Sequence, residues 1–428
     1  MKKINLKGIN ETIYKETLNN GLEVYLLPNN NVKNFYMTFS TKYGSLYTTF
    51  KDENDTSYKS IPNGVAHFLE HLTFKMEDGL DASEYFAKLG SNCNAYTSFK
   101  VTCYEVYAYN NFKENLNYLL DYVQTPCYNE KIVEAEKGII CEEVKMYEDN
   151  PNMNLTFEMN KCLFKNENYS NQVGGTVKDV KSTTLKNIND AYNMFYHPSN
   201  MFVIITGNFN LEEAISIIIE NQENKKFTNK VKPVIKKIHE PVSIVCDYKE
   251  IKTNVEIPKV NIGLKIPLKN FETLKLNREE LSIYLSIILN CNFGNSSILK
   301  EQLVSGNIIT DGIITQKYFT DDYLIINIIS ETPYPKRYID LVTNQLSKLV
   351  IDEDDLIRKK RVAISNLIQA TDDIEEMSYS IQSDIINYGK VIDNVYNIYN
   401  NLNLDKCKKI INKITTKNKA TLVLLPKD

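Results

Sequence analysis

Two of the four histidines in this chain lie four residues apart with a glutamate between them, in the segment His67-Phe68-Leu69-Glu70-His71. Residues three and four apart share one face of a helix, so these three polar side chains would lie side by side. Imidazole nitrogens are common zinc ligands, and a neighbouring carboxylate could activate water. The spacing therefore predicts a metal site, although two core histidines beside a surface glutamate would give the same pattern.

The residues around this pattern predict a buried helix. A turn-forming cluster at residues 60–64 includes Asn63 in position to cap it, and apolar residues then recur at helical spacing, at Val65, Phe68, Leu69, Leu72 and Phe74. Burying two imidazoles and a carboxylate carries a large desolvation cost unless they are paired or ligated. A bound metal ion would offset that cost.

A third ligand is expected, because catalytic zinc usually takes three protein ligands. Candidates lie at residues 129–147, where apolar residues again recur at near-helical intervals. Glu136 and Glu143 lie seven apart, two turns along one face, so one could bind metal while the other holds a ligand histidine. Glu142 competes with Glu143 by adjacency. A glutamate-rich helix is usually a solvated face, and only its pairing with the histidine helix makes it a candidate.

The order of residues in the histidine segment inverts the usual zinc-protease pattern and gives the inverzincin signature, His-x-x-Glu-His. It is followed by Glu136-x6-Glu143 and by three further fragments, Leu89-Gly90-Ser91-Asn92-Cys93-Asn94-Ala95-Tyr96-Thr97-Ser98, Gly174-Gly175-Thr176 and Tyr196-His197-Pro198-Ser199-Asn200-Met201. With these features the chain resembles the pitrilysin/insulinase family of zinc metallopeptidases. The resemblance covers nearly the whole chain and is to the short two-domain members, similar to the mitochondrial processing peptidase and its bacterial relatives.

This resemblance implies roles for the polar residues of both helices. The implied Zn²⁺ ligands are His67, His71 and Glu143. Glu70 would be the general base and Glu136 the supporting carboxylate, and the family's seven-residue step selects Glu143 over Glu142. The implied activity is zinc-dependent endopeptidase hydrolysis of unfolded peptides or peptide precursors.

The resemblance also implies a substrate-binding strand. The strand expected at residues 92–98 would be an exposed sheet edge beside the zinc, onto which a peptide adds as an extra strand through Asn94, Ala95 and Tyr96. Backbone pairing of this kind would let the enzyme accept many sequences. A purely structural strand is the alternative.

One departure from the family pattern bears on assembly. Active members usually carry an Arg and a Tyr, seven apart on a second-half helix, which hold the substrate and the tetrahedral intermediate. The matching register here offers Ile298 and Ser305, which cannot replace that contact. Losing such a contact costs about two to three orders of magnitude in rate. We therefore expect a homologous second subunit to supply the pair in a clamshell heterodimer; the alternatives are an inactive structural or docking homologue and a self-sufficient homodimeric peptidase.

The two halves of the chain repeat one order of expected elements. In the first half we expect strands at 22–28, 34–41, 92–98, 102–109 and 201–207 and helices at 82–88, 112–123, 129–147, 153–165 and 181–195. In the second half we expect strands at 242–248, 260–266, 308–316, 323–330 and 420–425 and helices at 278–289, 297–304, 338–349 and 353–371. The predicted fold class is α+β, with two homologous α/β-sandwich domains related by a pseudo-twofold duplication, each a mostly antiparallel sheet with helices packed on one side.

The duplication predicts one active copy. We expect a zinc-bearing catalytic domain at 1–221, a basic linker at 222–241 and a homologous domain at 242–428. A shift of 224 residues sets Lys360 under Glu136 and Leu367 under Glu143, so the second copy would have lost the metal site.

Composition excludes several other classes. The chain has 428 residues, 43% hydrophobic and 24% charged, with a net charge of −4 and no polybasic tract, which argues against a nucleic-acid partner. No apolar run is long enough to span a membrane and no signal peptide is visible. The eight cysteines lack Cys-x-x-Cys spacing, so we expect reduced thiols and a cytoplasmic location.

Overall fold

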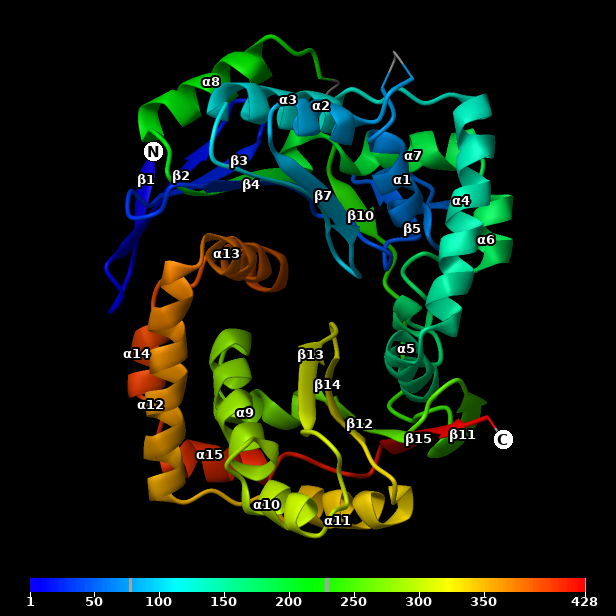
Figure 1. The fold of residues 1–428 in the computed structure, drawn as a ribbon, viewed down its shortest axis with the longest axis vertical. Coiled ribbons are helices and arrows are strands. Elements are labelled where there is room, and N and C mark those ends of the chain that lie inside the picture. Colours follow the sequence, from blue (N-terminus) through cyan, green and yellow to red (C-terminus); the bar gives the residue numbers. More distant parts are fainter. Residues whose placement is uncertain (77–78, 228–230, 428) are drawn as a thin grey trace. The chain divides into compact units, whose positions relative to one another are not determined.

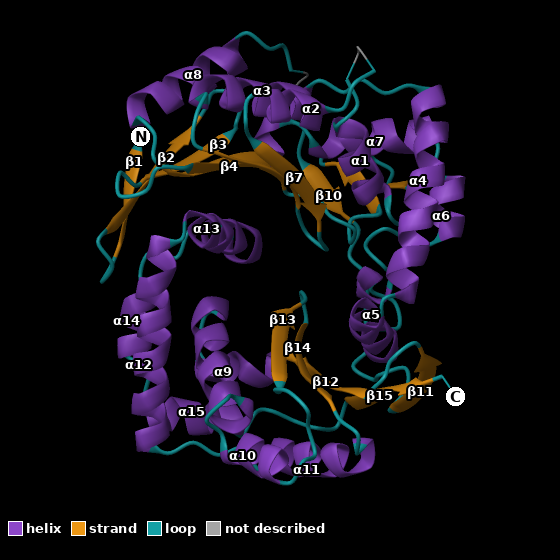
Figure 2. Ribbon diagram, in the orientation of Figure 1, coloured by secondary structure: helices purple, strands orange, loops and turns teal. Residues whose placement is uncertain are grey.

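A computed structural model describes residues 1–76, 79–227 and 231–427 of the chain. Contacts divide it into two compact units, each built around its own sheet and each described separately (Figures 1 and 2). Unit 1 comprises Met1–Lys145, Gln172–Lys237 and Ile368–Asp393, and unit 2 comprises Met146–Asn171, Ile238–Leu367 and Asn394–Asp428. Each unit therefore includes a segment from the other half of the sequence. The domain boundaries expected at 221 and 242 divide the sequence into halves and not into these units, and they stay a prediction.

Unit 1 is built on a seven-stranded sheet. Its spatial order is β1 (Lys2–Leu6), β2 (Glu11–Thr17), β3 (Glu23–Pro28), β9 (Met201–Gly207), β4 (Phe35–Thr41), β8 (Thr102–Ala108) and β7 (Asn92–Thr97). A small second sheet joins β10 (Pro233–Ile235), β5 (Thr49–Asp52) and β6 (Lys59–Ser60). Neighbouring strands are antiparallel except β3 and β9, which are parallel. The mostly antiparallel α+β architecture is confirmed.

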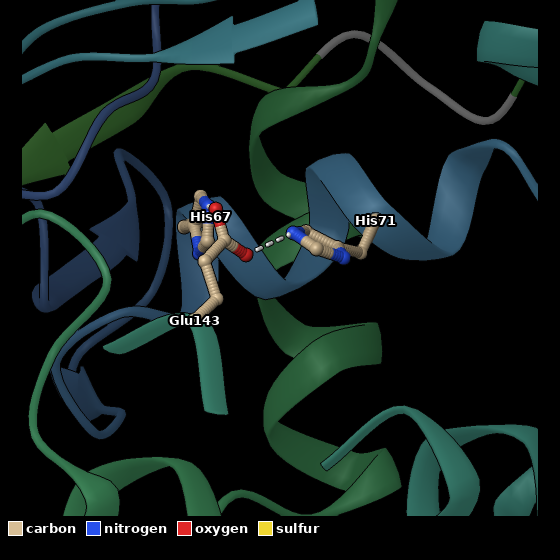
Figure 3. A group of neighbouring side chains, drawn as sticks. All are labelled: His67, His71 and Glu143. Carbon is tan, nitrogen blue, oxygen red and sulfur yellow. Dashed lines mark ion pairs between the residues drawn. The ribbon is translucent and has the colours of Figure 1, made fainter. Parts of the chain in front are cut away.

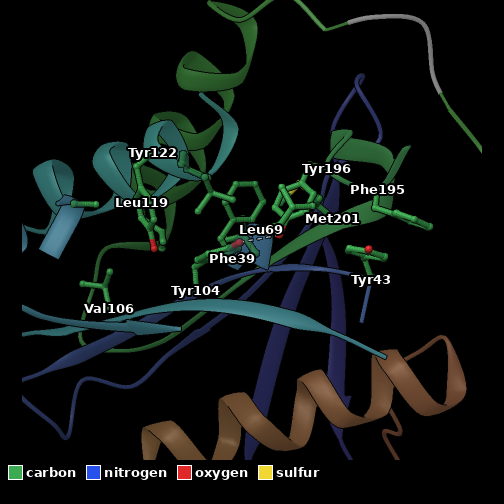
Figure 4. Packing of buried hydrophobic residues seen from close by; sticks show 14 of the residues in the cluster. Phe39, Tyr43, Leu69, Tyr104, Val106, Leu119, Tyr122, Phe195, Tyr196 and Met201 are labelled. Carbon is green, nitrogen blue, oxygen red and sulfur yellow. Dashed lines mark hydrogen bonds between the residues drawn. The ribbon is translucent and has the colours of Figure 1, made fainter. Parts of the chain in front are cut away.

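Helices of unit 1 cover one face of this sheet, and a further helix covers the other. The unit contains α1 (Val65–Thr73), α2 (Ala82–Lys88), α3 (Phe112–Gln124), most of α4 (Glu130–Asp149), α6 (Val177–Ser182), α7 (Leu185–Phe195), α8 (Leu211–Glu223) and α13 (Ile374–Tyr388). The main core lies on the α1 side, where Leu69 packs with sheet residues such as Phe39 and Tyr104 (Figure 4). Strand residues alternate between faces, so Tyr25 and Phe202 point away from this core into a second cluster.

That second cluster is covered by α13, which comes from the C-terminal half of the chain. Met377, Ile381 and Ile385 of α13 pack on the sheet, and Figure 1 shows this orange helix beside the blue strands. The 224-residue shift carries 151–163 onto 375–387, so α13 is the counterpart of α5 (Pro151–Leu163). The helix α5 packs on β12 and β15 of unit 2. The two copies have therefore exchanged equivalent helices.

Unit 2 repeats the plan on a five-stranded sheet. Its order is β11 (Tyr248–Thr253), β15 (Lys419–Pro426), β12 (Lys259–Pro267), β14 (Tyr323–Glu331) and β13 (Ile314–Phe319). Its helices, besides α5, are α9 (Arg278–Phe293), α10 (Ile298–Ser305), α11 (Pro335–Ser347), most of α12 (Glu353–Gln369), α14 (Val395–Asn400) and α15 (Leu404–Ile411). As in unit 1, one pair of neighbours, β11 and β15, is parallel.

Two strand predictions in the second half were wrong in position. The strand expected at 242–248 is displaced to β11, because the backbone N–H groups of Val245 and Cys246 bond to the carbonyl of Cys162 at the end of α5. The strand expected at 308–316 begins only at Ile314, because Ile308 instead donates its N–H to Leu303 at the end of α10. Both displacements arise from contacts that local sequence patterns do not show. Among the described helices, none has the length and apolar content needed to cross a bilayer.

The exchange of α13 leads to a prediction about stability. Replacing Ile381, which is 2% exposed, by Ala should lower the free energy of unfolding by about 2–5 kcal/mol, because it leaves a cavity between α13 and the sheet. Ile139→Ala makes the same chemical change at a 56% exposed helical site in unit 1 and should cost no more than about 0.5 kcal/mol. In hydrogen exchange followed by mass spectrometry, Ile381→Ala should speed exchange in β4 and β9. Faster exchange in β12 and β14 alone would contradict the assignment of α13 to unit 1.

Candidate metal centre

The helix α1 starts where two glycine-containing loops meet. Gly64 precedes it in a left-handed conformation, with φ 81°, and an added Cβ would lie 2.2 Å from the carbonyl oxygen of Gly174. A side chain is excluded at Gly175 for the same reason, since an added Cβ would lie 2.6 Å from the carbonyl oxygen of Asn63. The expectation that Asn63 caps α1 is wrong: the N-cap is Gly64, and no side-chain cap bond forms there. Close approach of the two loops sets the start of the helix instead.

The buried face of α1 is the predicted one. Val65, Phe68, Leu69 and Leu72 are at most 1% exposed and belong to the main core of unit 1. Their burial fixes the rotation of the helix, so that His67 and His71 reach Glu143 of α4, whereas Glu70 reaches Thr97 at the end of β7.

Two histidines of α1 and one glutamate of α4 converge at one point. Single ligand atoms of His67, His71 and Glu143 all lie within 4.8 Å of one another. The Nε2 atom of His71 lies 3.0 Å from Oε2 of Glu143, and Nε2 of His67 lies 3.6 Å from Oε1 (Figure 3). Glu142, the competing neighbour, pairs with Lys145 on the exposed side of α4. The helical step from Glu136 thus brings Glu143, and not Glu142, to the histidines.

Glu136 holds the other ring nitrogen of His71. Its Oε1 lies 3.1 Å from His71 Nδ1, its Oε2 lies 3.3 Å from the amine of Lys75, and the residue is 4% exposed. Burial raises the pKa of this carboxyl, but the contacts with His71 and Lys75 outweigh burial and hold the pKa below its usual value. A carboxylate on one nitrogen fixes the ring and leaves the other nitrogen directed at the centre, as in ligand histidines.

The charges around His71 favour a cation at this point. Burial lowers the pKa of His71, but Glu136 and Glu143 outweigh it and raise the pKa to about 9. His67, 7% exposed, has a buried Nδ1 with no hydrogen-bond partner among the described residues, and a Cβ on Gly174 would lie 3.5 Å from that atom. Two imidazoles and a carboxylate are a donor set that suits Zn²⁺, so these residues fit a divalent metal.

Glu70 lies beside the three converging side chains but outside their group. Its Oε2 accepts a hydrogen bond of 2.6 Å from the hydroxyl of Thr97. Burial raises the pKa of Glu70, while the neighbouring His67 and the Thr97 hydrogen bond act in the opposite direction. A carboxyl with a raised pKa can both accept a proton and give it back.

The predicted substrate strand lies at the edge of the sheet. β7 pairs with β8 on one side only, and the side chain of Asn94 is exposed while those of Ala95 and Tyr96 are half-buried. The Tyr96 hydroxyl donates to Gln382 of α13. Peptide binding by this strand stays a prediction.

In unit 2 the positions matching the two glutamates carry no carboxylate. Lys360 and Leu367 both lie on α12, the counterpart of α4. The group of possible metal ligands found among the described residues belongs to unit 1. Ile298 and Ser305 are the first and last residues of α10, and Ile298 is 73% exposed.

Two residues of the site were missed in the sequence. Lys75 contacts Glu136, and Thr97 contacts Glu70. Lys75 is four residues beyond His71, and the alternation of β7 puts Thr97 on the same face as Ala95, so both positions could have been considered. Neither spacing identifies the atoms contacted.

Comparison with known proteins agrees with this geometry. Residues 54–177 match the family model described as insulinase (peptidase family M16), and residues 182–362 match the peptidase M16 inactive domain. An uncharacterized zinc protease of Bacillus subtilis, YmfH, is 35% identical over 370 residues, covering 85% of this chain and 85% of its own length. The chain belongs to the insulinase family, peptidase family M16. It corresponds to the short two-domain form, because the two family models match successive parts of the chain and the match to YmfH covers 85% of both chains.

Two further proteins resemble this chain over most of its length. The zinc protease PqqE of Helicobacter pylori is 26% identical over 388 residues, covering 86% of this chain and 83% of its own. The crystal structure of an M16-like peptidase from Alicyclobacillus acidocaldarius shares the fold with a TM-score of 0.92 and 24% identity, over 99% of this chain and 100% of that one.

The convergence on Glu143 predicts the outcome of a pair of substitutions. Glu143→Gln should weaken Zn²⁺ binding by at least about 100-fold, since a direct ligand should matter no less than its supporting groups. Glu142→Gln, next to it in the sequence, should bind Zn²⁺ as the wild type does, because its side chain faces away from the histidines. Titration calorimetry with Zn²⁺ on the metal-stripped chain measures both. Equal losses in the two variants would contradict the assignment.

Proposed function

We propose that this chain is a zinc-dependent endopeptidase that hydrolyses unfolded peptides or peptide precursors. The observation that carries the proposal is the convergence of His67, His71 and Glu143, with the Glu70 carboxylate beside them and outside their group. Relatives over most of the chain that carry the name zinc protease support it.

In this proposal the converging residues bind Zn²⁺, which when bound supplies the Lewis acidity that polarises a carbonyl group and makes water a better nucleophile. Glu136 keeps His71 oriented through its Nδ1 atom, and Lys75 holds the other oxygen of Glu136. These contacts keep the ligand nitrogen of His71 directed at the centre.

Glu70 acts as the general base. It takes a proton from the water that attacks the scissile carbonyl, and it later gives that proton to the leaving amine. The raised pKa that burial produces at Glu70 suits both steps, because the group must accept and release the proton within one cycle.

The substrate backbone would pair with the open edge of β7. An extended peptide added there would lie along Asn94, Ala95 and Tyr96 and bond to those of their backbone groups that face the open edge, and the same strand ends at Thr97 beside Glu70. Pairing through backbone groups favours unfolded peptides and tolerates many sequences.

We further propose that the chain works as the zinc-bearing subunit of a heterodimer. The family's Arg and Tyr are replaced by Ile298 and Ser305, the end residues of α10, and a homologous second subunit would supply the missing pair. No disulfide joins the eight cysteines of the described chain, which supports a reducing, cytoplasmic setting.

Replacing the base should separate hydrolysis from metal binding. Glu70→Gln should lower the rate of peptide cleavage by at least about 100-fold, because the amide cannot accept the proton. Zn²⁺ content should stay at the wild-type level, since Glu70 lies outside the ligand group. Cleavage of a fluorogenic unstructured peptide and metal analysis give the two readouts, with Glu142→Gln as the exposed glutamate control. A Glu70→Gln variant that cleaved normally would show that Glu70 is not the base.

The partner can be tested with the same peptide assay. Adding a homologous chain that carries the Arg and Tyr should raise the cleavage rate of the zinc-loaded chain about 100- to 1,000-fold. If the same partner carries Arg→Met and Tyr→Phe, most of this increase in cleavage rate should be lost. Cleavage as fast by the chain alone would favour a self-sufficient homodimer, and absence of cleavage with any partner would favour a docking homologue.

A further inference from the structure

Thr97, the last residue of β7, connects the edge strand to the helix that carries the base. Its Oγ1 lies 2.6 Å from Oε2 of Glu70 and donates its proton to that carboxylate. Among the described residues, the hydrogen bond found for the Glu70 carboxylate comes from this hydroxyl. No such bond to the other carboxylate oxygen, Oε1, is found among the described residues.

The neighbours of Thr97 determine where its proton goes. The hydroxyl of Thr102 lies 3.3 Å away and donates its own proton to the carbonyl of Tyr43 at 3.0 Å. Thr97 therefore has two acceptors within reach, the Thr102 oxygen and the Glu70 carboxylate. The carboxylate is both closer and charged, so it takes the stronger bond.

We propose that Thr97 is a positioning residue, which holds Oε2 of Glu70 and so presents Oε1 for proton transfer. This inference rests on the proposed peptidase function. The hydrogen bond ties the base to the strand on which the substrate backbone would lie, so base and substrate share one rigid frame. A misplacement of about 1 Å in such a frame can cost about 100-fold in rate.

The matched variants are Thr97→Val and Thr97→Ser. Valine keeps the branched shape at Cβ and removes the hydroxyl, whereas serine keeps the hydroxyl. In the zinc-loaded full chain, assayed with its homologous partner, Thr97→Val should lower kcat about 10- to 100-fold and leave KM within about twofold. Thr97→Ser should restore kcat to within about threefold of the wild type, because the donor is present again.

Two further measurements separate positioning from structure. Zn²⁺ affinity and the midpoint of thermal unfolding should be unchanged in both variants, because the hydrogen bonds found for the Thr97 hydroxyl among the described residues go to Glu70 and Thr102 and not to a candidate ligand. Thr38→Val is the control. Thr38 is buried on β4 of the same sheet, and its hydroxyl has no hydrogen-bond partner among the described residues, so its loss should not change kcat.

The outcomes are distinct. Wild-type kcat in Thr97→Val, or a serine variant as slow as the valine one, would overturn the inference while the peptidase function stands. A rise in KM alone would also overturn it, since it would make Thr97 a substrate contact. A wild-type chain that cleaves no peptide under any condition would remove the proposed function and this inference with it.

Discussion

His71 is held by carboxylates of one helix on both of its ring nitrogens, and the rest of the site depends on this contact. Glu136 and Glu143 lie two turns apart on α4, so they reach Nδ1 and Nε2 of the same ring. Removing several polar groups from water is costly unless each finds a partner. Three features bring these groups together. They are the start of α1 at Gly64, the burial of Leu69 and the burial of Glu136.

Unit 2 also contains buried charged groups, but they form an ion pair. In unit 2 the fully buried amine of Lys265 pairs with Glu240 at 2.6 Å and also donates to the carbonyl of Leu163, at the end of α5. Glu240 in turn accepts backbone N–H groups from the loop after α5. This charged pair ties the exchanged helix to the sheet of unit 2, where each charge has a partner. The same architecture thus uses buried charge for a metal centre in one copy and for attachment of a helix in the other.

The exchange of α5 and α13 follows from the needs of the two sheets. Each sheet has two apolar faces, because successive residues of its central strands point to opposite sides and nearly all of them are buried, and each sheet requires a cover on both faces. The helices that cover the second face come from equivalent places in the two halves of the sequence. Neither half of the chain contains all the elements of its own compact unit, so the two halves depend on each other to complete their cores.

Much of the site is present in the sequence. The spacing of His67, Glu70 and His71 predicts one helical face, the seven-residue step predicts that Glu136 and Glu143 share another, and the apolar stripe of α1 predicts its burial. These are local regularities, set by the period of the helix. Most of the strands and helices expected in both halves are found. Besides the two displaced strands, the helix expected at 181–195 divides into α6 and α7 at Thr184, which caps α7, and several elements, among them β1, β2, α8 and α13, were not expected.

Tertiary structure alone decided how distant segments meet. The start of α1 depends on the close approach of Gly174 and Gly175, and the start of β11 depends on the hydrogen bonds to Cys162. The second face of the sheet of unit 1 is covered by α13. The contacts of Lys75 with Glu136 and of Thr97 with Glu70 likewise join separate elements. Sequence patterns report which face of an element is apolar, but not which other element lies against it, because that depends on how the whole chain packs. The sequence by itself thus determined the family and the residues available for chemistry, and the packing determined which atoms meet.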